Sequence, residues 1–317
     1  MLPPPVAVTP EILLDHPIPT WFGIGGRARR LAKPRTLDEL RACLDLDPGL
    51  RILGDGANLL VADAGVPELV VSLAEGDFGQ FSIGQPDQKG YAIVRAGAGV
   101  HLFKLINACV DAGLAGLENL AGIPARVGGA IVMNAGGKYG STGDYVSAVE
   151  VLTRPTSGAP PELKTLKRNQ IEFSYRFCAL TCQQSIVTHV HFRLRTADPA
   201  ALRAKLAEVT AYKKSTQPLS ANSAGCCFKN PTLTDHVPDI GTPGTRVSAG
   251  LLIDRAGCKG LKVGGASVSD QHANFIVAAP GCTAADIIEL MRQVRARVDL
   301  AFGLTLEPEV VLWGASL

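Results

Sequence analysis

The distribution of glycine is the feature that most constrains the fold of this chain. The sequence has 34 glycines in 317 residues. Many of them fall in GIGG at 23–26, GDGANLLV at 54–61, AGAG at 96–99, AGIPARVGGAIVMNAGGKYG at 121–140 and KVGG at 262–265. Glycine permits positive φ angles and lets the backbone approach a ligand closely. Because these loops alternate with valine- and isoleucine-rich runs, they predict a backbone shaped around something bulky.

Two of the glycine loops are long enough to suggest what that molecule is. The loop at 54–58 follows a predicted strand, and successive N–H groups in such a turn form an anion-binding nest that suits phosphate or pyrophosphate. A single loop of this kind could equally be a plain tight turn. The sequence lacks a GxGxxG motif that opens a helix within a βαβ unit, so it matches a Rossmann site poorly. Together, the loops at 54–58 and 122–137 favour a dinucleotide cofactor.

Local patterns predict helices and strands throughout the chain. Thr36 and Glu39 have the spacing of a helix-capping box, and Thr283 and Asp286 have the same spacing before an amphipathic helix. Further helices are expected at 101–116 and 200–214, and strands at 51–61 around a glycine turn, 69–73, 91–100, 147–153, 185–195 and 304–314. The order predicts two lobes, at 1–75 and 76–197, and a third domain at 198–317.

Composition excludes several classes of protein. Hydrophobic residues make up 46% of the chain, and the formal charge of +2 offers no electrostatic reason to bind nucleic acid or a membrane surface. No apolar run reaches the roughly 18 residues of a membrane span. The first 17 residues lack a basic region followed by an apolar one, so we expect no secretion signal.

Cysteine and histidine offer few metal-binding patterns. Eight scattered cysteines fit a reducing cytoplasm better than a disulfide-dense secreted domain. Cys178 and Cys182 have no matching second pair of cysteines. We therefore expect two isolated thiols there, with zinc binding as the alternative. His189 and His191 share one face of the strand at 185–195, for which we expect a polar sheet face, with metal binding as the alternative. We predict no metal site.

The stretch SAGCCFKNP at 223–231 places two cysteines side by side in a turn. Neighbouring cysteines rarely form a disulfide, because the bridge needs Cα atoms about 4.4–6.8 Å apart and suitable Cβ directions. Buried, inert thiols are one interpretation. A partly exposed thiol with a pKa of about 8.5 that donates a proton is the other. Elsewhere, Arg176 suits an ion pair or a bidentate carboxylate contact, whereas Glu307 and Glu309 say little alone.

The order of these motifs resembles the MurB family of UDP-N-acetylenolpyruvoylglucosamine reductases. The resemblance runs from about Thr20 to Gly314, and the series of motifs is specific although each is weak alone. It rests on PTWFGIGGRA, LGDGANLLV, GLENLAGIPARVGGAIVMNAGG, FSYR, SAGCCFKNP, AGLLIDRAGCKGLKVGGASVSDQHANFIV and FGLTLEPEV. It implies an α+β fold with a two-lobed FAD-binding domain of the vanillyl-alcohol-oxidase (PCMH) type and a C-terminal α+β substrate-binding domain. The chain resembles the shorter type, without a long substrate-loop insertion.

The resemblance also implies a reaction. NADPH reduces FAD, and hydride then passes to the vinyl carbon of UDP-N-acetylglucosamine enolpyruvate. The enolate that develops is stabilised and is protonated at its α-carbon, giving UDP-N-acetylmuramate for peptidoglycan precursor synthesis. We therefore expect a cytoplasmic, monomeric enzyme with a small-molecule substrate and neither a nucleic-acid nor a membrane partner.

Site residues follow from the resemblance, position by position. Arg176 matches the arginine that stabilises the enolate, Glu309 the glutamate beside it, and Cys226 the serine that usually donates the proton, with Cys227 as packing. Lys214, Asn230 and His272 match substrate-binding positions. The expected FAD-binding positions are Gly54, Asp55, Gly56, Ala57, Asn58, Leu59, Gly122, Ile123, Pro124, Val127, Gly128, Gly129, Ala130, Asn134 and Gly136.

Three positions depart from the family pattern. The closing EVVLWG replaces the usual EVRFIG, so Val311 removes an arginine that would help bind substrate anions. GIPARVGGA replaces GIPGTVGGA, so Ala125 and Arg126 either change the flavin contacts or supply the lost charge. Cys226 replaces serine; its thiol is a stronger acid than a hydroxyl by several pKa units and is open to oxidation.

Two other functions fit parts of this pattern. A flavin oxidase of the same superfold would act on another small molecule and use oxygen as acceptor, but the motifs of the third domain argue against it. A catalytically silent flavin-binding regulator would explain the arginine missing at 311. The retention of Arg176, Glu309 and a protic group at 226 argues against that alternative.

Overall fold

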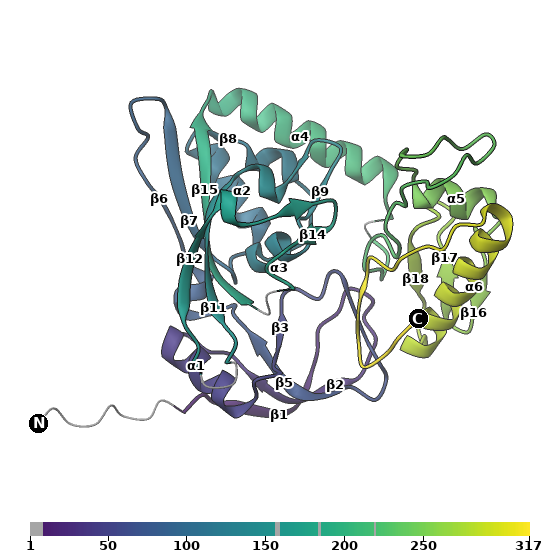
Figure 1. The fold of residues 1–317 in the computed structure, drawn as a ribbon, viewed down its shortest axis with the longest axis horizontal. Coiled ribbons are helices and arrows are strands. Elements are labelled where there is room, and N and C mark those ends of the chain that lie inside the picture. The colour runs from purple at the N-terminus through teal and green to yellow at the C-terminus, as the bar shows by residue number, and fades with distance from the viewer. Residues whose placement is uncertain (1–8, 156–158, 183–184, 219) are drawn as a thin grey trace, which may run out of the picture. The chain divides into compact units, whose positions relative to one another are not determined.

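The chain folds into two compact units, each assembled from several stretches of sequence. A computed structural model describes residues 9–155, 159–182, 185–218 and 220–317 (Figure 1). Unit 1 comprises the residues up to His16 together with Arg29–Gly54 and Pro67–Lys213. Unit 2 comprises Pro17–Ala28, Asp55–Val66 and Lys214–Leu317.

This division differs from the expected domains at 1–75, 76–197 and 198–317. The two expected lobes correspond to two separate sheets that both belong largely to unit 1. The later boundary lies between Lys213 and Lys214 rather than at 197/198, and two N-terminal segments join unit 2. The first eight residues, part of the stretch for which no secretion signal was expected, lie outside the described residues.

The first sheet of unit 1 has four strands in the order β1-β2-β5-β3. Helix α1 (Leu37–Leu46) belongs to the same region, and the Thr36 side chain accepts a hydrogen bond from the N–H of Glu39, as the capping spacing predicts. The strands are β1 (Ile12–Pro17), β2 (Arg27–Ala32), β3 (Arg51–Leu53) and β5 (Val66–Ser72).

The second sheet of unit 1 is larger and antiparallel throughout. Its path runs β12-β11-β15-β7-β6, and β8 pairs with β15 beside that path. Its strands are β6 (Phe81–Ile83), β7 (Tyr91–Gly97), β8 (Leu114–Ala115), β11 (Val146–Thr153), β12 (Leu163–Lys167) and β15 (Ser185–Thr196). Helices α2 (Leu102–Asp111) and α3 (Val127–Val132) lie on one side of it (Figure 1).

Short hairpins and one long helix complete unit 1. Strands β9 (Gly136–Gly137) and β10 (Gly140–Ser141) pair, as do β13 (Phe173–Ser174) and β14 (Phe177–Cys178). Helix α4 (Pro199–Thr216) begins after Asp198, whose carboxylate accepts hydrogen bonds from the N–H groups of Ala200 and Ala201. The Asp198-Pro199 pair thus starts the helix where the sequence predicts it.

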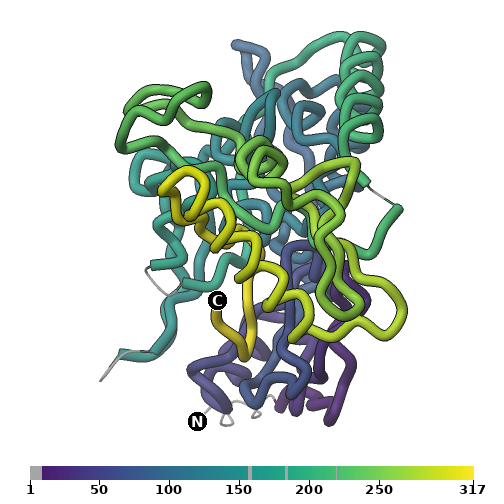
Figure 2. The backbone as a smooth tube through the Cα atoms, turned by 90° about the vertical axis from the view of Figure 1, so that its right-hand side faces the viewer, coloured from purple at the N-terminus to yellow at the C-terminus, as the bar shows by residue number. Residues whose placement is uncertain are grey.

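Unit 2 is built on a three-stranded antiparallel sheet. Helices α5 (Ala249–Arg255) and α6 (Ala284–Phe302, the long yellow helix of Figure 2) accompany β16 (Lys262–Val263), β17 (Ala266–Val268) and β18 (Ile276–Ala278). The Thr283–Asp286 capping box is formed, and the predicted apolar stripe of α6 is buried in the core. In addition, β4 (Leu59–Val61) pairs in parallel with β19 (Val311–Trp313). This long-range pair draws an N-terminal segment into unit 2.

Each unit has its own hydrophobic core. In β15 the alternate residues Ile186, Thr188, Val190, Phe192 and Leu194, which share one face of the strand, are all buried. Among the described residues, no helix combines the length and the apolar composition that a membrane crossing requires.

Candidate active site

A pocket of about 380 Å³ in unit 1 lies among the glycine loops. Three of the expected FAD-binding residues line it, namely Gly54, Gly128 and Gly129. Its other lining residues are Ile52, Leu53, Leu73, Ala98, Gly99, Arg126, Val132, Arg154, Thr181, Ser185, Ile186 and Val187. We call this cavity the glycine pocket.

Glycines shape this pocket in two ways. A Cβ atom on Gly99 would lie 1.5 Å from the carbonyl oxygen of Leu73, so only glycine lets the two backbones approach here. A Cβ on Gly128 would lie 2.9 Å from the Cβ of Ala98. Gly54 and Gly129, in contrast, have nothing within 4 Å of that position. The first pair fixes the pocket wall, and the second pair leaves open space beside it.

The glycine pocket is positively charged. Arg126 and Arg154 both line it, and none of the described residues that line it is acidic. The guanidinium of Arg154 donates to the carbonyl oxygens of Pro48 and Leu50, at 2.6 and 2.8 Å, and burial lowers its pKa from the ordinary value. Two cations in a glycine-lined cavity suit a pyrophosphate group.

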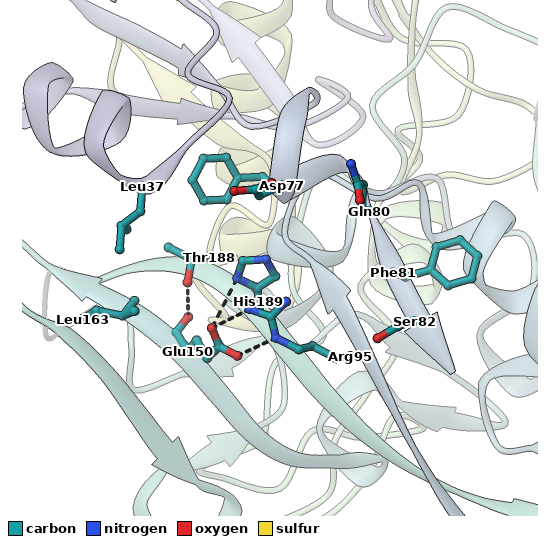
Figure 3. A pocket seen from close by; sticks show the side chains of 11 residues that line it. Leu37, Asp77, Gln80, Phe81, Ser82, Arg95, Glu150, Leu163, Thr188 and His189 are labelled. Carbon is teal, nitrogen blue, oxygen red and sulfur yellow. Dashed lines mark hydrogen bonds and ion pairs between the residues drawn. The ribbon is translucent and has the colours of Figure 1, made fainter. Parts of the chain in front are cut away.

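A second pocket of unit 1, of about 350 Å³, has a different chemistry (Figure 3). Arg95 forms a bidentate pair with Glu150, at 2.7 and 2.9 Å, and this pair holds the pKa of Glu150 down at about 2. Asp77 and His189 also line the cavity. With two carboxylates among its lining residues, it is a poorer place for a pyrophosphate than the glycine pocket.

The histidine pair of β15 lies beside this second pocket. The Nε2 atom of His191 is 2.7 Å from a carboxylate oxygen of Glu150, and the Nδ1 atom of His189 is 3.4 Å from the other. The expected polar sheet face is correct for His191 but not for His189, which is buried because the ring of Phe78 packs 5.9 Å away. Within the described part of the chain, no cluster of three or more His, Cys, Asp or Glu side chains could hold a metal ion.

Other expected FAD-binding residues of unit 1 do not line the glycine pocket. Val127 and Ala130 are wholly buried in the core. Asn134 is buried with φ of 39°, and its amide bonds the Ser174 carbonyl and the Gly143 N–H. Ile123 packs against the same core, and Pro124 follows it. These residues support the loop from inside.

Arg176 contacts the end of this glycine loop from the hairpin of β13 and β14. It has φ of 53°, in the left-handed region, within the turn between β13 and β14. Its guanidinium donates to the carbonyl oxygen of Gly136 at 3.0 Å. Strained backbone of this kind in non-glycine residues is common at functional positions.

Lys213 is a neighbour of Arg176 that the sequence analysis missed. Its Cδ atom lies 2.9 Å from where a Cβ on Gly122 would be, so Gly122 makes room for the lysine stem. Burial and the charge of Arg176 lower the pKa of Lys213 to about 8. Lys214, the expected substrate ligand, is exposed on the next position of α4. The lysine that lies near Arg176 is therefore Lys213, one residue before the expected Lys214.

Unit 2 brings Cys226, Cys227 and Glu309 together. The N–H of Glu309 donates to the carbonyl oxygen of Cys227 at 2.8 Å, and Asn58 donates from its amide to the Glu309 carbonyl at 3.0 Å. Cys226 is half-buried, whereas Cys227 is buried and its thiol pKa is raised to about 12 by burial. The thiol at 226 is therefore the more accessible of the two, and Cys227 packs in the core of unit 2.

Another residue missed from the sequence fixes this turn. Asn274 is buried; its amide accepts from the N–H of Phe228 at 3.0 Å and donates to the Phe228 carbonyl at 2.8 Å. Its own carbonyl accepts from the N–H of Cys227 at 2.8 Å. An asparagine inside the apolar run HANFIV was the only sequence signal. We call this arrangement of Asn274 and residues 226–228 the cysteine turn.

The remaining candidates of unit 2 are distributed around the cysteine turn. The Asn230 side chain accepts from the N–H of Ala249, at the start of α5. His272 packs edge-on against Phe275 at 4.8 Å between ring centroids, and burial lowers its pKa. Val311, where an arginine was expected, is exposed on β19.

The other expected FAD-binding residues of the first glycine loop also belong to unit 2. Gly56 has φ of 64°, and a Cβ there would lie 2.0 Å from the carbonyl oxygen of Pro19. Asp55 and Ala57 flank it, and Leu59 is buried at the start of β4. The loop thus lies closely against residues 19–20.

Comparisons with known proteins find two families that match separate parts of the chain. Residues 28–158 match the family described as FAD binding domain. Residues 217–313 match the family described as UDP-N-acetylenolpyruvoylglucosamine reductase, C-terminal domain. The expected fold, an FAD-binding domain followed by a second α+β domain, is confirmed.

Similarity to individual proteins extends along nearly the whole chain. A UDP-N-acetylenolpyruvoylglucosamine reductase of Desulfosudis oleivorans is 39% identical over 305 residues, which cover 93% of this chain and 91% of the relative. One of Moorella thermoacetica is 39% identical, with coverages of 97% and 95%. The crystal structure of MurB from Thermus caldophilus superposes with a TM-score of 0.74 at 38% identity, covering 96% of this chain and 98% of that one. The chain therefore belongs to the MurB family of UDP-N-acetylenolpyruvoylglucosamine reductases.

Proposed function

We propose that this protein reduces UDP-N-acetylglucosamine enolpyruvate to UDP-N-acetylmuramate with electrons from NADPH, in peptidoglycan precursor synthesis. The observation that carries this proposal is the similarity to reductases of that name over 93% of the chain, at 39% identity. The protein also has an FAD-binding domain, and NADPH is the electron donor of the family.

The glycine pocket is the part of the chain that fits FAD. Gly54 and Gly129 leave room for the cofactor, Gly128 forms part of the wall, and Arg154 contributes positive charge. Bound there, FAD supplies the chemistry that moves hydride from NADPH to the substrate. The remaining steps belong to side chains of the protein.

Each expected catalytic residue has a role that suits its surroundings. Reduction adds hydride to the terminal vinyl carbon and a proton to the α-carbon, so the C=C bond becomes a single bond. Arg176 stabilises the negative charge of the enolate and its carboxylate, and the nearby Lys213 adds to that positive field. Cys226 delivers the proton to the α-carbon as general acid. Glu309 is assigned a role in the same step because it matches the glutamate that accompanies this arginine in the family.

The substrate's nucleotide half is assigned to residues of unit 2. Asn230 offers an amide near the start of α5, and His272 offers a ring beside Phe275. Lys214 is exposed at the end of α4, where an ammonium group can meet a phosphate. These assignments rest on the matching motif positions.

We also infer a cytoplasmic monomer that binds neither nucleic acid nor membrane. The eight cysteines, all within the described residues, form no disulfide, as a reducing compartment favours. Light scattering coupled to size-exclusion chromatography tests the monomer; a mass of twice 33.2 kDa would contradict it.

Exchange of Cys226 for alanine and for serine tests the function and the proton donor together. Bound flavin is reduced anaerobically with NADPH, the enolpyruvate substrate is added, and reoxidation is followed by absorbance. We expect Cys226→Ala to slow reoxidation about 10²–10⁴-fold, the usual contribution of a general acid. Cys226→Ser, which restores the family's usual residue, should react nearly like the original protein. NADPH should reduce the flavin equally fast in all three.

Other outcomes identify the alternatives. If the unmodified protein is reduced by NADPH but reoxidised only by oxygen, it is a flavin oxidase acting on another molecule. If it binds FAD but NADPH does not reduce it, a silent flavin-binding regulator is the better description.

A further inference from the structure

Arg126 is a residue of the glycine pocket that the family pattern does not explain. The usual GIPGTVGGA has a short threonine at this position, whereas this chain has a long cationic side chain in GIPARVGGA. Two roles were open from the sequence: contact with the flavin cofactor, or replacement of the arginine missing at Val311.

The contacts of Arg126 tie its guanidinium to the wall of the glycine pocket. One terminal nitrogen donates to the carbonyl oxygen of Gly99, and the other lies 3.2 Å from the Nε2 atom of His101. The backbones of His101 and Arg126 also form a β-bridge. Gly99 itself lines the pocket. Several bonds thus hold the arginine at the cavity in which the glycines leave room.

The charge of this cavity indicates which part of a ligand faces Arg126. Arg126 and Arg154 both line it, with no acidic residue among the described lining residues, and Gly129 beside Arg126 leaves open space. An arginine fork binds phosphate oxygens well because its N–H groups match their geometry. A pyrophosphate is the dianionic part of FAD.

We propose that Arg126 binds the pyrophosphate of FAD and that it does not replace the arginine missing at Val311. This inference rests on the proposed function, since it requires FAD as the cofactor. It assigns to one arginine of this chain a contact with phosphate that the shorter threonine would make only through its hydroxyl.

Binding measurements on the apoprotein test the assignment without relying on turnover. Kd values for FAD, ADP and riboflavin are measured by flavin fluorescence and calorimetry for the unmodified protein, Arg126→Thr and Arg126→Lys. A charged hydrogen bond to phosphate corresponds to a roughly tenfold to hundredfold change in Kd. We expect Arg126→Thr to weaken FAD and ADP by that factor and to leave riboflavin, which has no phosphate, unchanged. Arg126→Lys should recover part of the loss.

A matched control separates this effect from a general loss of positive charge. Arg203 lies on α4 and pairs with Asp111 at the surface, at 3.1 Å. Arg203→Thr should keep the original Kd values for all three ligands. Circular dichroism and melting curves confirm that each variant is folded. If Arg126→Thr does not fold, the FAD and ADP affinities of Arg126→Lys still test the inference. The lysine keeps the positive charge but lacks the forked guanidinium that binds phosphate oxygens.

Each contrary result has its own meaning. Unchanged FAD and ADP affinities in Arg126→Thr overturn the inference while the reductase assignment stands. A raised KM for the UDP substrate at saturating FAD, with unchanged FAD affinity, shows instead that Arg126 replaces the missing arginine. If the unmodified protein binds no FAD at all, the proposed function itself is wrong.

Discussion

The glycine pocket of unit 1 and the cysteine turn of unit 2 are built by opposite means. In the pocket, space and close approach come from missing atoms: Gly99 lets two backbones meet, and Gly129 leaves open volume. In the turn, position comes from added polar groups: Asn274 bonds both the N–H and the carbonyl of Phe228. A binding cavity needs room for its ligand, whereas a proton donor needs a fixed position.

This difference predicts opposite sensitivities to mutation. The pocket should fail when an atom is added to its wall, and the turn should fail when a polar group is removed. Lys213, a half-buried cation, provides a third and smaller test because the free energy that its burial costs depends on pH.

Gly99→Ala should have the largest effect. The added Cβ would lie 1.5 Å from the Leu73 carbonyl oxygen, so the wall between the two backbones must move. We expect the free energy of unfolding to fall by about 4 kcal/mol or more, measured by urea denaturation. Gly137→Ala is the control, since nothing lies within 4 Å of its Cβ position; it should change stability little. Equal unfolding curves for the two variants would contradict the steric account of the pocket.

Asn274→Ala tests the cysteine turn by removing atoms. Two buried backbone groups of Phe228 would lose their partners, which should cost about 2–3 kcal/mol of unfolding free energy. The rate of flavin reoxidation by substrate should also fall, because residue 226 is no longer held. Asn107→Ala, which removes one exposed bond to the Phe103 carbonyl, is the control. A variant with unchanged stability and an unchanged reoxidation rate would show that the turn keeps its conformation without the Asn274 side chain.

Lys213→Met should have the smallest effect and a definite sign with pH. The folded-state pKa of about 8 lies below the ordinary 10.5, so the unfolded chain binds this proton more tightly. Below about pH 8 the charged lysine destabilises the folded state by its full amount. This destabilisation disappears as the pH rises from 8 toward 10.5. We therefore expect the methionine variant to be more stable by about 1 kcal/mol at pH 7. That advantage should vanish by pH 10.5.

Melting curves at several pH values measure this difference. Lys205→Met, which removes a half-buried lysine of the same helix paired with Glu208, controls for the general loss of charge. Parallel pH profiles for the original protein and Lys213→Met would mean that Lys213 titrates normally.

The sequence predicted local structure well because its signals are local. Helix caps at Thr36 and Thr283 and the alternating apolar residues of β15 depend on neighbours a few positions away. The proximity of Glu309 to the two cysteines was also predictable, since Cys226 and Glu309 lie in motifs that resemble a known family. The backbone bond between Glu309 and Cys227 agrees with their expected proximity.

Features that depend on distant partners were not predictable. The burial of His189 requires Phe78, which covers it from another part of the chain. Lys213 and Lys214 look alike in sequence, but successive side chains of a helix differ in direction by about 100°. Lys213 is therefore half-buried near Arg176, whereas Lys214 is exposed. Arg154 lies in none of the quoted motifs, and the motif that contains Asn274 gives no sign of its bonds to Phe228. The division into units was missed because the pairing of β4 with β19 leaves no local signal.

The pairing of β4 with β19 has a consequence for how the protein is made. Asn58 bonds a residue 251 positions further along, and β4 itself is fully apolar and buried. On a ribosome, β4 is synthesised long before its partner, because the bonded residues Asn58 and Glu309 are 251 positions apart. Contacts of such sequence separation form late, and the unpaired strand is exposed to aggregation meanwhile. Unit 2 should therefore complete its folding only after residues 311–313 have been synthesised, and truncation before residue 311 should leave a chaperone-dependent product.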